Sequence, residues 1–427
     1  MNDKLVPRDR GFMGFLRDFT MGNTDRVNKI NRSITEYNAT SIDAFFSPEN
    51  GVYNSIISGG DINSRTNAII AQARCAIANK FPVIVLHEGN RMLENKLERA
   101  FNPQNKYFEI SNRCRSFEPF YGLDASDVTN EILEIAPKDF DIKYSARYYI
   151  EGVSEILKYK KKYLSFKMLL QCPHAMIFDI AEDLYNQGVI DDKKEHEIKS
   201  KLMMGQGENY KIDALLNNLS REVNEVRYLP KCGFKPNNII KACDRNAVTC
   251  IDIVASKNKL YIDTLVYQLE LATKLSKQYV IIVDSIFLNS TKAYESFMLN
   301  PSEKIGRMIA SDDLFSMAGG DEKNFSILTA TSPTMIIMAH QSAKSAEKWS
   351  EVLGQYERWN ESYSNSRGAS KNSPFSLFSS PNYQNSTSLS KSREFVVRPE
   401  QILHLSRGEA FVMSTACGNI SHLFFNG

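Results

Sequence analysis

The hydrophobic pattern changes period twice between residues 54 and 86, and this change constrains the fold more than any other feature of the chain. Residues 54–57 are a short apolar stretch, and residues 58–66 (SGGDINSRT) are rich in glycine and polar side chains. Helical spacing then places five apolar side chains on one face, namely Ile69, Ile70, Ala73, Ala76 and Ile77. Pro82 ends this helix, and residues 83–86 form an apolar run typical of a strand buried on both faces. The order strand, loop, helix, strand indicates a parallel α/β sheet.

The same pattern returns in the second half of the chain. Residues 248–254 (VTCIDIV) and 279–283 (YVIIV) predict two further buried strands. The helix between them carries apolar residues at three- and four-residue spacing, at Leu265, Leu269, Ala272 and Leu275. Residues 335–338 predict another strand and residues 343–353 another helix. We therefore expect an α/β fold with a mostly parallel sheet.

Three segments differ from this α/β part. Residues 144–228 are rich in Lys, Glu, Leu and Met and predict an inserted all-α domain. Residues 360–391 are dominated by Ser and Asn and predict a mobile loop, because they bury too little apolar surface to offset the entropy of ordering. Residues 1–50 predict an N-terminal arm. The α/β domain is then expected to comprise residues 51–143 and 229–427.

Composition excludes several classes of protein. The 427 residues are 42% hydrophobic and 24% charged, unlike collagen-like, coiled-coil or wholly disordered chains. The net charge is only +2, which excludes a histone-like partner of nucleic acid. No apolar run approaches the ~20 residues that cross a bilayer, and no secretory signal is recognisable, so we expect a cytoplasmic chain without a transmembrane segment. The 7 cysteines and 6 histidines are scattered, which argues against a disulfide framework or a zinc site.

The glycine-rich loop after the first strand is a candidate phosphate-binding loop. Such loops follow G-x-x-x-x-G-K-[ST] between a strand and a helix, because backbone N–H groups and one lysine must surround the phosphates. Here Gly59 and Thr66 match, whereas Ser64 and Arg65 replace the second glycine and the lysine. A plain strand-to-helix turn is the alternative interpretation. The candidate nucleotide-binding residues are Gly59, Gly60, Asn63, Ser64, Arg65 and Thr66.

The second element of a phosphoryl-transfer site is an acidic residue that ends a buried strand and helps to hold Mg²⁺. Asp284 ends the strand at residues 279–283, so Asp284 and Thr66 are the candidate metal-side residues. A Glu that activates water usually follows the acidic residue, but here Ser285 follows it. A hydroxyl is a poor general base, and loss of a positioned base typically costs ~10² to 10⁴-fold in rate. The alternative is that Asp284 only caps the next loop.

The order of these motifs, and two C-terminal stretches, carry a resemblance to a known family. Residues 346–354 follow the spacing A-x-x-x-S-x-x-x-G, and residues 398–405 (RPEQILHL) loosely follow R-P-x-x-L. In these features the chain resembles the conjugative coupling proteins of type IV secretion systems, which belong to the FtsK/HerA superfamily of P-loop motors. The resemblance covers most of residues 50–420.

This resemblance implies a RecA-like P-loop domain with an inserted all-α domain, and ATP and Mg²⁺ as cofactors if the site is functional. It also implies a homo-oligomeric ring, hexameric in the family, or a hetero-oligomer with an active homologue, acting on DNA. The chain departs from the family at Ser64-Arg65 and Asp284-Ser285, and the sequence does not predict the N-terminal transmembrane helices that family members usually carry. A polar sensor, normally Gln, is replaced by Ser311 or Asp312.

Three functions stay open from the sequence. The first is a coupling-protein-like P-loop protein with impaired ATP hydrolysis in an oligomeric DNA-translocation or conjugative-transfer assembly. The second is an active ATP-driven motor with non-standard catalytic residues, for which Glu88 or Asp312 are the candidate bases. The third is a structural adaptor that binds a protein through the helical insertion. The candidate catalytic residues are therefore Asp284, Ser285, Asp312 and Glu88.

The densest basic run is a candidate nucleic-acid contact. Residues 158–163 (KYKKKY) carry four lysines, Lys158, Lys160, Lys161 and Lys162, with two tyrosines available to stack on bases. A solvated helix surface is the alternative, because on a helix these lysines spread over more than one face. Arg113 and Arg115 form a second candidate that ordinary surface charge also explains.

Overall fold

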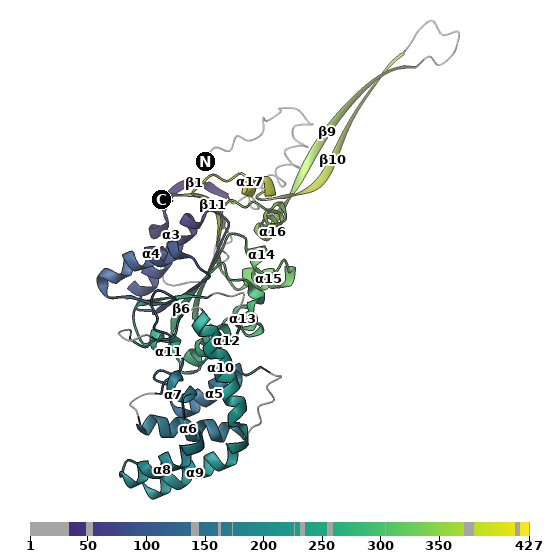
Figure 1. Ribbon diagram of the computed structural model, residues 1–427. Coiled ribbons are helices and arrows are strands. Elements are labelled where there is room, and N and C mark those ends of the chain that lie inside the picture. Colours follow the sequence, from purple (N-terminus) through teal and green to yellow (C-terminus); the bar gives the residue numbers. More distant parts are fainter. Residues whose placement is uncertain are drawn as a thin grey trace.

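The computed structural model places a broad sheet at one end of the molecule, a group of helices at the other, and a long two-stranded ribbon projecting from the sheet (Figure 1). The structure describes residues 34–47, 54–137, 145–160, 164–172, 174–225, 227–230, 235–253, 259–303, 305–370, 380–414 and 419–426. Most of the expected N-terminal arm, residues 1–33 and 48–50, lies outside these ranges. Within the arm, residues 34–41 form a strand that joins the sheet and residues 42–45 a short helix.

The main sheet has ten strands. In spatial order they are β1 (Ile34–Ser41), β12 (Asn419–Asn426), β11 (Glu409–Ser414), β8 (Thr334–Ile337), β2 (Ser55–Ser58), β7 (Ile305–Ser311), β6 (Tyr279–Asp284), β3 (Val83–His87), β5 (Val248–Asp252) and β4 (Tyr107–Ile110). All neighbours are parallel except β11, which is antiparallel to both β8 and β12. The mostly parallel α/β sheet is confirmed, and the order β8-β2-β7-β6-β3 is that of a RecA-like P-loop domain.

Helices cover both faces of this sheet. They are α2 (Ile42–Phe45), α3 (Ile62–Ala78), α4 (Arg91–Phe101), α11 (Ile239–Cys243), α12 (Lys259–Lys274), α13 (Lys292–Leu299), α14 (Leu314–Met317), α15 (Glu322–Ala330), α16 (Ala343–Leu353) and α17 (Pro399–Leu403). Adjacent residues of a strand enter different cores: Ile57 packs with α3 and α4, whereas Ile56 packs with the core that contains α12 and α16. This alternation explains the uninterrupted apolar runs of β3 and β6, because both faces of each strand are buried.

The helical end of the molecule is built from α5 (Ala125–Ile135), α6 (Ala146–Lys160), α7 (Phe166–Leu170), α8 (Ile177–Asn186), α9 (Asp192–Gly205) and α10 (Asn209–Glu225). Its apolar side chains belong to the same core cluster as one face of the sheet, through contacts of α5 and α10 with α12. The helices are therefore anchored on the sheet rather than built around a separate core. Among the described residues, every helix is too short or too polar to cross a lipid bilayer.

The Ser- and Asn-rich segment differs from the expectation of a mobile loop. Its described residues belong to β9 (Gln355–Ser370) and β10 (Ser380–Phe395), which pair antiparallel along their whole length. A ladder of this kind is held by backbone N–H and C=O groups and needs no apolar side chains, so composition alone does not reveal it. Residues 371–379, between the strands, lie outside the described residues.

Candidate functional site

The glycine-rich loop and Asp284 both lie at the carboxyl ends of the parallel strands. The parallel register pairs Ser58 of β2 with Ser311 of β7, and Ala310 of β7 with Asp284 of β6. Adjacent strands are ~4.8 Å apart, so the end of β2 and Asp284 are separated by one strand and by about 10 Å of backbone. Carboxyl ends of parallel strands are the usual ligand position in α/β sheets.

The loop after β2 is shorter than the sequence predicts. Gly59 and Gly60 have φ angles of +87° and +72°, and α3 already begins at Ile62. The two glycines pass close to the end of β8, since an added Cβ at Gly59 would lie 2.6 Å from the Ala339 carbonyl oxygen. Residues 62–66, which we expected in the loop, are therefore the first turn of the helix.

The carboxylate of Asp61 occupies the N-terminus of this helix. Its Oδ1 accepts a hydrogen bond from the Ser64 backbone N–H at 2.8 Å, and its Oδ2 lies 2.9 Å from Nε of Arg407. Partial burial raises the pKa of Asp61, but the Ser64 hydrogen bond and the Arg407 charge outweigh it, and the pKa is lowered overall. The helix end that receives phosphate in a P-loop thus carries a carboxylate of the chain itself.

The side chains of the other candidate-loop residues are hydrogen-bonded or buried within the protein. Nη1 of Arg65 donates a hydrogen bond to the Gly60 carbonyl at 2.7 Å, and the Arg65 residue is only 8% exposed. Thr66 is fully buried, and its hydroxyl has no hydrogen-bond partner among the described residues. The amide oxygen of Asn63 accepts a hydrogen bond from Lys96 of α4. Neither Arg65 nor Thr66 lines the adjacent cavity.

A cavity of about 780 Å³ opens beside the loop at this edge of the sheet. Its charged lining consists of four carboxylates and one guanidinium, with one histidine, namely Asp61, Asp312, Asp313, Glu409, Arg407 and His340. Gly60, Ser64 and Ser285 line it as well, as does Ser311. The cavity therefore brings together parts of the candidate phosphate loop, the residue after Asp284 and the candidate sensor residues, but with an excess of negative charge.

A buried hydrogen-bond cluster holds the end of β2 below this cavity. The hydroxyl of Ser58 accepts hydrogen bonds from the Leu314 backbone N–H and the Trp349 indole N–H, both at 3.1 Å. It lies 2.8 Å from Nε2 of His340, whose Nδ1 lies 2.8 Å from the Met338 carbonyl oxygen. Because a carbonyl only accepts, Nδ1 carries the proton and Nε2 accepts from Ser58. Burial lowers the pKa of His340 and favours this neutral form.

Asp284 is buried and bonded within the protein. It is 3% exposed, and it accepts hydrogen bonds from Nδ2 of Asn90 at 2.6 Å and from the Ser285 hydroxyl at 3.1 Å. Ser285 has a φ of +56° and lines the cavity, but Asp284 does not. Glu88 is exposed after β3 and is also outside the cavity lining. Asp312 is the one candidate base that lines it.

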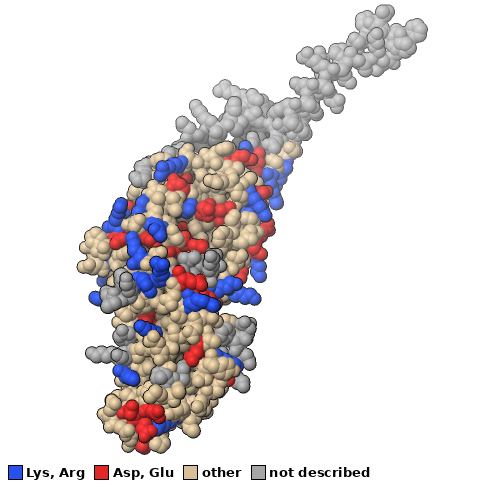
Figure 2. All heavy atoms as spheres, viewed as in Figure 1, with Lys and Arg blue, Asp and Glu red and all other residues tan. Residues whose placement is uncertain are grey.

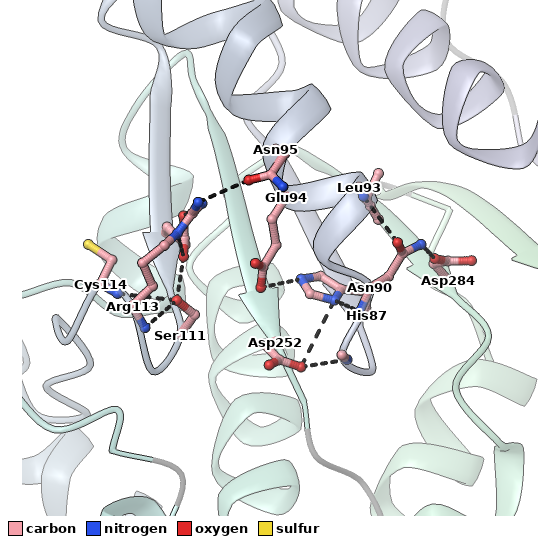
Figure 3. Close-up of polar contacts among 12 residues, drawn as sticks. His87, Asn90, Leu93, Glu94, Asn95, Ser111, Arg113, Cys114, Asp252 and Asp284 are labelled. Carbon is pink, nitrogen blue, oxygen red and sulfur yellow. Dashed lines mark hydrogen bonds and ion pairs between the residues drawn. The ribbon is translucent and has the colours of Figure 1, made fainter. Parts of the chain in front are cut away.

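A second polar cluster, which the sequence analysis did not identify, lies at the ends of β3 and β5 (Figure 3). His87 is fully buried; its Nδ1 accepts a hydrogen bond from the Asn90 backbone N–H, and its Nε2 lies 3.6 Å from Glu94. Asp252 of β5 accepts a hydrogen bond from the Gly89 N–H at 2.8 Å. Burial, followed by the charges of Glu109 and Asp252, raises the pKa of Glu94 to about 7. The cluster fixes the turn that positions Asn90 against Asp284.

The basic run near residue 160 is only partly described. Lys158 and Lys160 are exposed at the end of α6, whereas Lys161 and Lys162 lie outside the described residues. Figure 2 shows acidic side chains gathered at the tip formed by α8 and α9. Exposed acidic residues of these helices and of the turn between them include Asp179, Glu182, Asp183, Asp191 and Asp192. This tip carries the wrong sign of charge for phosphate contacts.

One group of residues on α9 has the spacing of metal ligands. Asp192, Glu195 and His196 can each offer one ligand atom, and these three atoms lie within 4.8 Å of one another. Lys199, however, forms an ion pair with Glu195 at 2.7 Å, and the other two side chains are 74% exposed. This arrangement is that of a solvated helix surface with paired charges. It is separate from the expected Mg²⁺ residues, Thr66 and Asp284.

Comparisons with known proteins give similarity at the level of structure alone. No protein-family model and no curated protein matches the sequence. The unbound form of the bacterial conjugative coupling protein TrwBdeltaN70 aligns at 14% identity over 94% of this chain and 91% of that chain, with a TM-score of 0.48. The plasmid coupling protein TrwB with ADP and Mg²⁺ aligns at 13% identity over 94% and 92%, with a TM-score of 0.47. VirB4 of Thermoanaerobacter pseudethanolicus aligns at 8% identity over 88% and 89%, with a TM-score of 0.44. The similarity is therefore one of fold.

Proposed function

We propose that this chain is a RecA-like P-loop protein that has lost ATP turnover and serves as a non-hydrolysing subunit of an oligomeric assembly of the coupling-protein type. The sequence motifs that resemble that family support the assembly and its action on DNA or on a transported substrate. The loss of turnover is supported by the residues of the site itself. One observation carries it: the Asp61 carboxylate accepts the Ser64 N–H at the start of α3.

This contact competes with a triphosphate bound in the usual position. A phosphate group at a helix N-terminus is stabilised by the same free N–H groups and by the positive end of the helix dipole. The Asp61 carboxylate already accepts the Ser64 N–H and lies at the positive end of the dipole, and Arg407 neutralises its charge. An entering phosphate would have to displace a carboxylate that is part of the chain.

The charge of the cavity also opposes nucleotide binding. Four carboxylates surround a space where a nucleotide would bring three to four negative charges, and a single guanidinium, Arg407, opposes them. Arg65, which replaces the lysine of the motif, is bonded to the Gly60 carbonyl and does not line the cavity. The carboxylate of Asp284 likewise accepts a hydrogen bond from Asn90. The residues present therefore do not fit Mg²⁺-ATP.

The test compares the wild-type chain with a variant that restores the phosphate-loop sequence. Titration with Mg²⁺-ATP by calorimetry, together with a phosphate-release assay, is expected to give no binding and no turnover for the wild type. The triple variant Asp61→Ala, Ser64→Gly, Arg65→Lys restores G-x-x-x-x-G-K-T and removes the competing capping side chain, and we expect it to gain ATP binding. Thermal unfolding checks that both proteins are folded. Wild-type turnover that Asp284→Ala abolishes would overturn the proposal and favour an active motor.

A further inference from the structure

Two connections between the sheet and the helical end of the molecule meet at one buried place. The first connection, residues 116–123, precedes α5, and the second includes residues 235–238, just before α11. The Glu118 N–H donates a hydrogen bond to the Asn237 carbonyl at 2.9 Å, and the Asn237 N–H donates one to the Ser116 carbonyl at 2.7 Å. α12 packs against α5, α10 and α11 in the same region (Figure 1). These two connections, with the facing parts of α5, α7 and α12, form the junction between the two ends of the molecule.

Two fully buried side-chain amides hold the parts of the junction together. Nδ2 of Asn238, in the second connection, donates hydrogen bonds to backbone carbonyls of the first connection. Nε2 of Gln268, on α12, donates hydrogen bonds of 2.9 Å to the Pro119 carbonyl and to Oε1 of Glu131 on α5. One glutamine therefore connects the sheet side of the junction to the first helix of the helical end.

The junction buries two carboxyl groups, and neither has a cation beside it. Glu118 is 4% exposed and Glu131 is 0% exposed. Oε1 of Glu118 accepts a hydrogen bond from the N–H of Phe166, in the first turn of α7, at 2.5 Å. Oε2 of Glu131 has no hydrogen-bond partner among the described residues. Within the described part of the chain, no lysine, arginine or histidine forms an ion pair with either carboxyl group.

Burial without a cation favours the neutral form of both carboxyl groups. Burial raises the pKa of Glu118 to about 7, although hydrogen bonds from the N–H groups of Phe166 and Phe120 oppose the shift. Burial raises the pKa of Glu131 well above its ordinary value of 4.5, although the hydrogen bond from Gln268 opposes it. Both side chains therefore hold the junction together as neutral acids.

The titratable groups that face Glu131 strengthen this preference. They are Asp127 on the same helix, Glu118 in the first connection and Tyr267 on α12. Arg147 of α6 lies near Tyr267, but its guanidinium donates a hydrogen bond to Asn130 at 2.6 Å and pairs with Glu151 at 3.6 Å. Loss of the protons of Glu118 and Glu131 would therefore add negative charge to a dry region whose other acidic groups repel it.

We propose that the junction is a pH-sensitive contact, in which neutral Glu118 and Glu131 hold the helical end on the sheet and loss of their protons loosens α7 and α5 from the first connection. The folded-state pKa of each group lies above its unfolded value near 4.5. Their stabilising contribution is therefore complete below pH 4.5 and is lost as the pH rises through the folded-state pKa, which for Glu118 is about 7. The inference is independent of the proposed loss of ATP turnover, because neither carboxyl group lines the cavity beside the glycine-rich loop.

The test is amide hydrogen exchange of the full chain at pH 6 and pH 8.5, corrected for the intrinsic pH dependence of exchange. In the wild type we expect the protection of α7 to fall about tenfold between the two pH values, whereas β6 keeps its protection. A group with a pKa of about 7 in the closed state and near 4.5 in the open state changes the opening equilibrium by about this factor over this range. Glu118→Gln and Glu131→Gln stay neutral at both pH values and should reduce the fall. The control Glu134→Gln removes an exposed carboxylate of α5 and should keep the wild-type fall.

Three results would refute the proposal. The first is equal protection of α7 at both pH values in the folded wild type. The second is a fall of the same size in the wild type and in both glutamine variants. The third is an equal fall in α7 and β6, which would mean that the whole chain opens rather than the junction. Circular dichroism shows whether each variant is folded, and the wild-type comparison of α7 with β6 tests the proposal without any substitution.

Discussion

The Nδ2 group of Asn90 donates a hydrogen bond to Oδ2 of Asp284 across 2.6 Å, so the acidic residue that ends β6 is held by the turn after β3. In a working P-loop enzyme, the corresponding carboxylate serves a metal ion and its water shell. Here the carboxylate is 3% exposed and its second oxygen accepts a hydrogen bond from Ser285. The side chain of Asp284 therefore connects the end of β6 to the turn after β3.

The first prediction concerns Asp284→Ala. Removing the carboxylate leaves the half-buried Asn90 amide without its acceptor, and we expect the free energy of unfolding to fall by about 1 kcal/mol. Phosphate release should stay at background in both proteins. Urea unfolding measures the first quantity, with Asp284→Asn as the matched control because it retains an acceptor oxygen. Unchanged stability would contradict the structural role.

The second prediction concerns the helix cap at Asp61. Asp61→Ala removes the acceptor for the Ser64 N–H and the partner of Arg407, and we expect a loss of about 1 kcal/mol of stability. Asp61→Asn keeps a capping oxygen and should lose less. Chemical denaturation of both variants measures the difference. If the alanine variant were as stable as the asparagine variant, the capping hydrogen bond would not stabilise the start of α3.

The third prediction concerns the tight passage of Gly59. An added Cβ would lie 2.6 Å from the Ala339 carbonyl oxygen and 2.7 Å from that of Met338, and φ is +87°. We expect Gly59→Ala to destabilise the chain by about 2 kcal/mol or more. Gly89 is a matched control, because its φ is also positive, at +63°, but nothing lies within 4 Å of its added Cβ. Gly89→Ala should cost about 1 kcal/mol, from the backbone conformation alone. Thermal unfolding of the two variants separates the cost of the steric clash at Gly59 from the cost of the positive φ angle that both positions share.

The sheet was predictable because its strands are buried on both faces. The apolar runs at residues 83–86 and 279–283 correspond to β3 and β6 within one residue at their ends. The length of the glycine-rich loop was not predicted, although an aspartate at residue 61 is itself a signal for the start of a helix. The eight-residue motif and this capping pattern compete for the same residues, and the cap determines where the helix begins.

The cluster of His87, Glu94 and Asp252 could not be predicted from the sequence. His87 and Asp252 are far apart in the chain, and they meet because the register of β3 and β5 pairs them directly. A single sequence gives no information about that register. The order β6-β3-β5 brings Asp284 and Asp252 to either side of His87, and this too follows from the topology alone. The only signal in the sequence is a histidine that ends a buried strand.

The fourth prediction concerns Glu94, whose pKa burial raises to about 7. Its folded pKa lies above the unfolded value near 4.5, so the stability that its protonated form contributes is fully present below pH 4.5 and is lost as the pH rises towards 7. We expect the wild type to lose stability from this group between pH 5 and pH 8, whereas Glu94→Gln loses less. Urea midpoints at the two pH values measure the effect. Glu98→Gln, at a half-buried position on the same helix, controls for the removed charge.

The last prediction concerns His340, whose hydrogen bond with Ser58 connects the ends of β2 and β8. Burial lowers its pKa below the ordinary value of 6.5, although the nearby carboxylates of Asp313 and Asp312 oppose this shift. The folded chain therefore binds this proton less readily than the unfolded chain, and the contribution of His340 to stability is complete above pH 6.5 and declines as the pH falls below it. We expect the wild type to lose more stability between pH 7 and pH 5 than His340→Gln does. His196→Gln, at a side chain that is 74% exposed, should keep the wild-type slope. Equal slopes for the wild type and His340→Gln would mean that protonation of this ring does not open the cluster below the cavity.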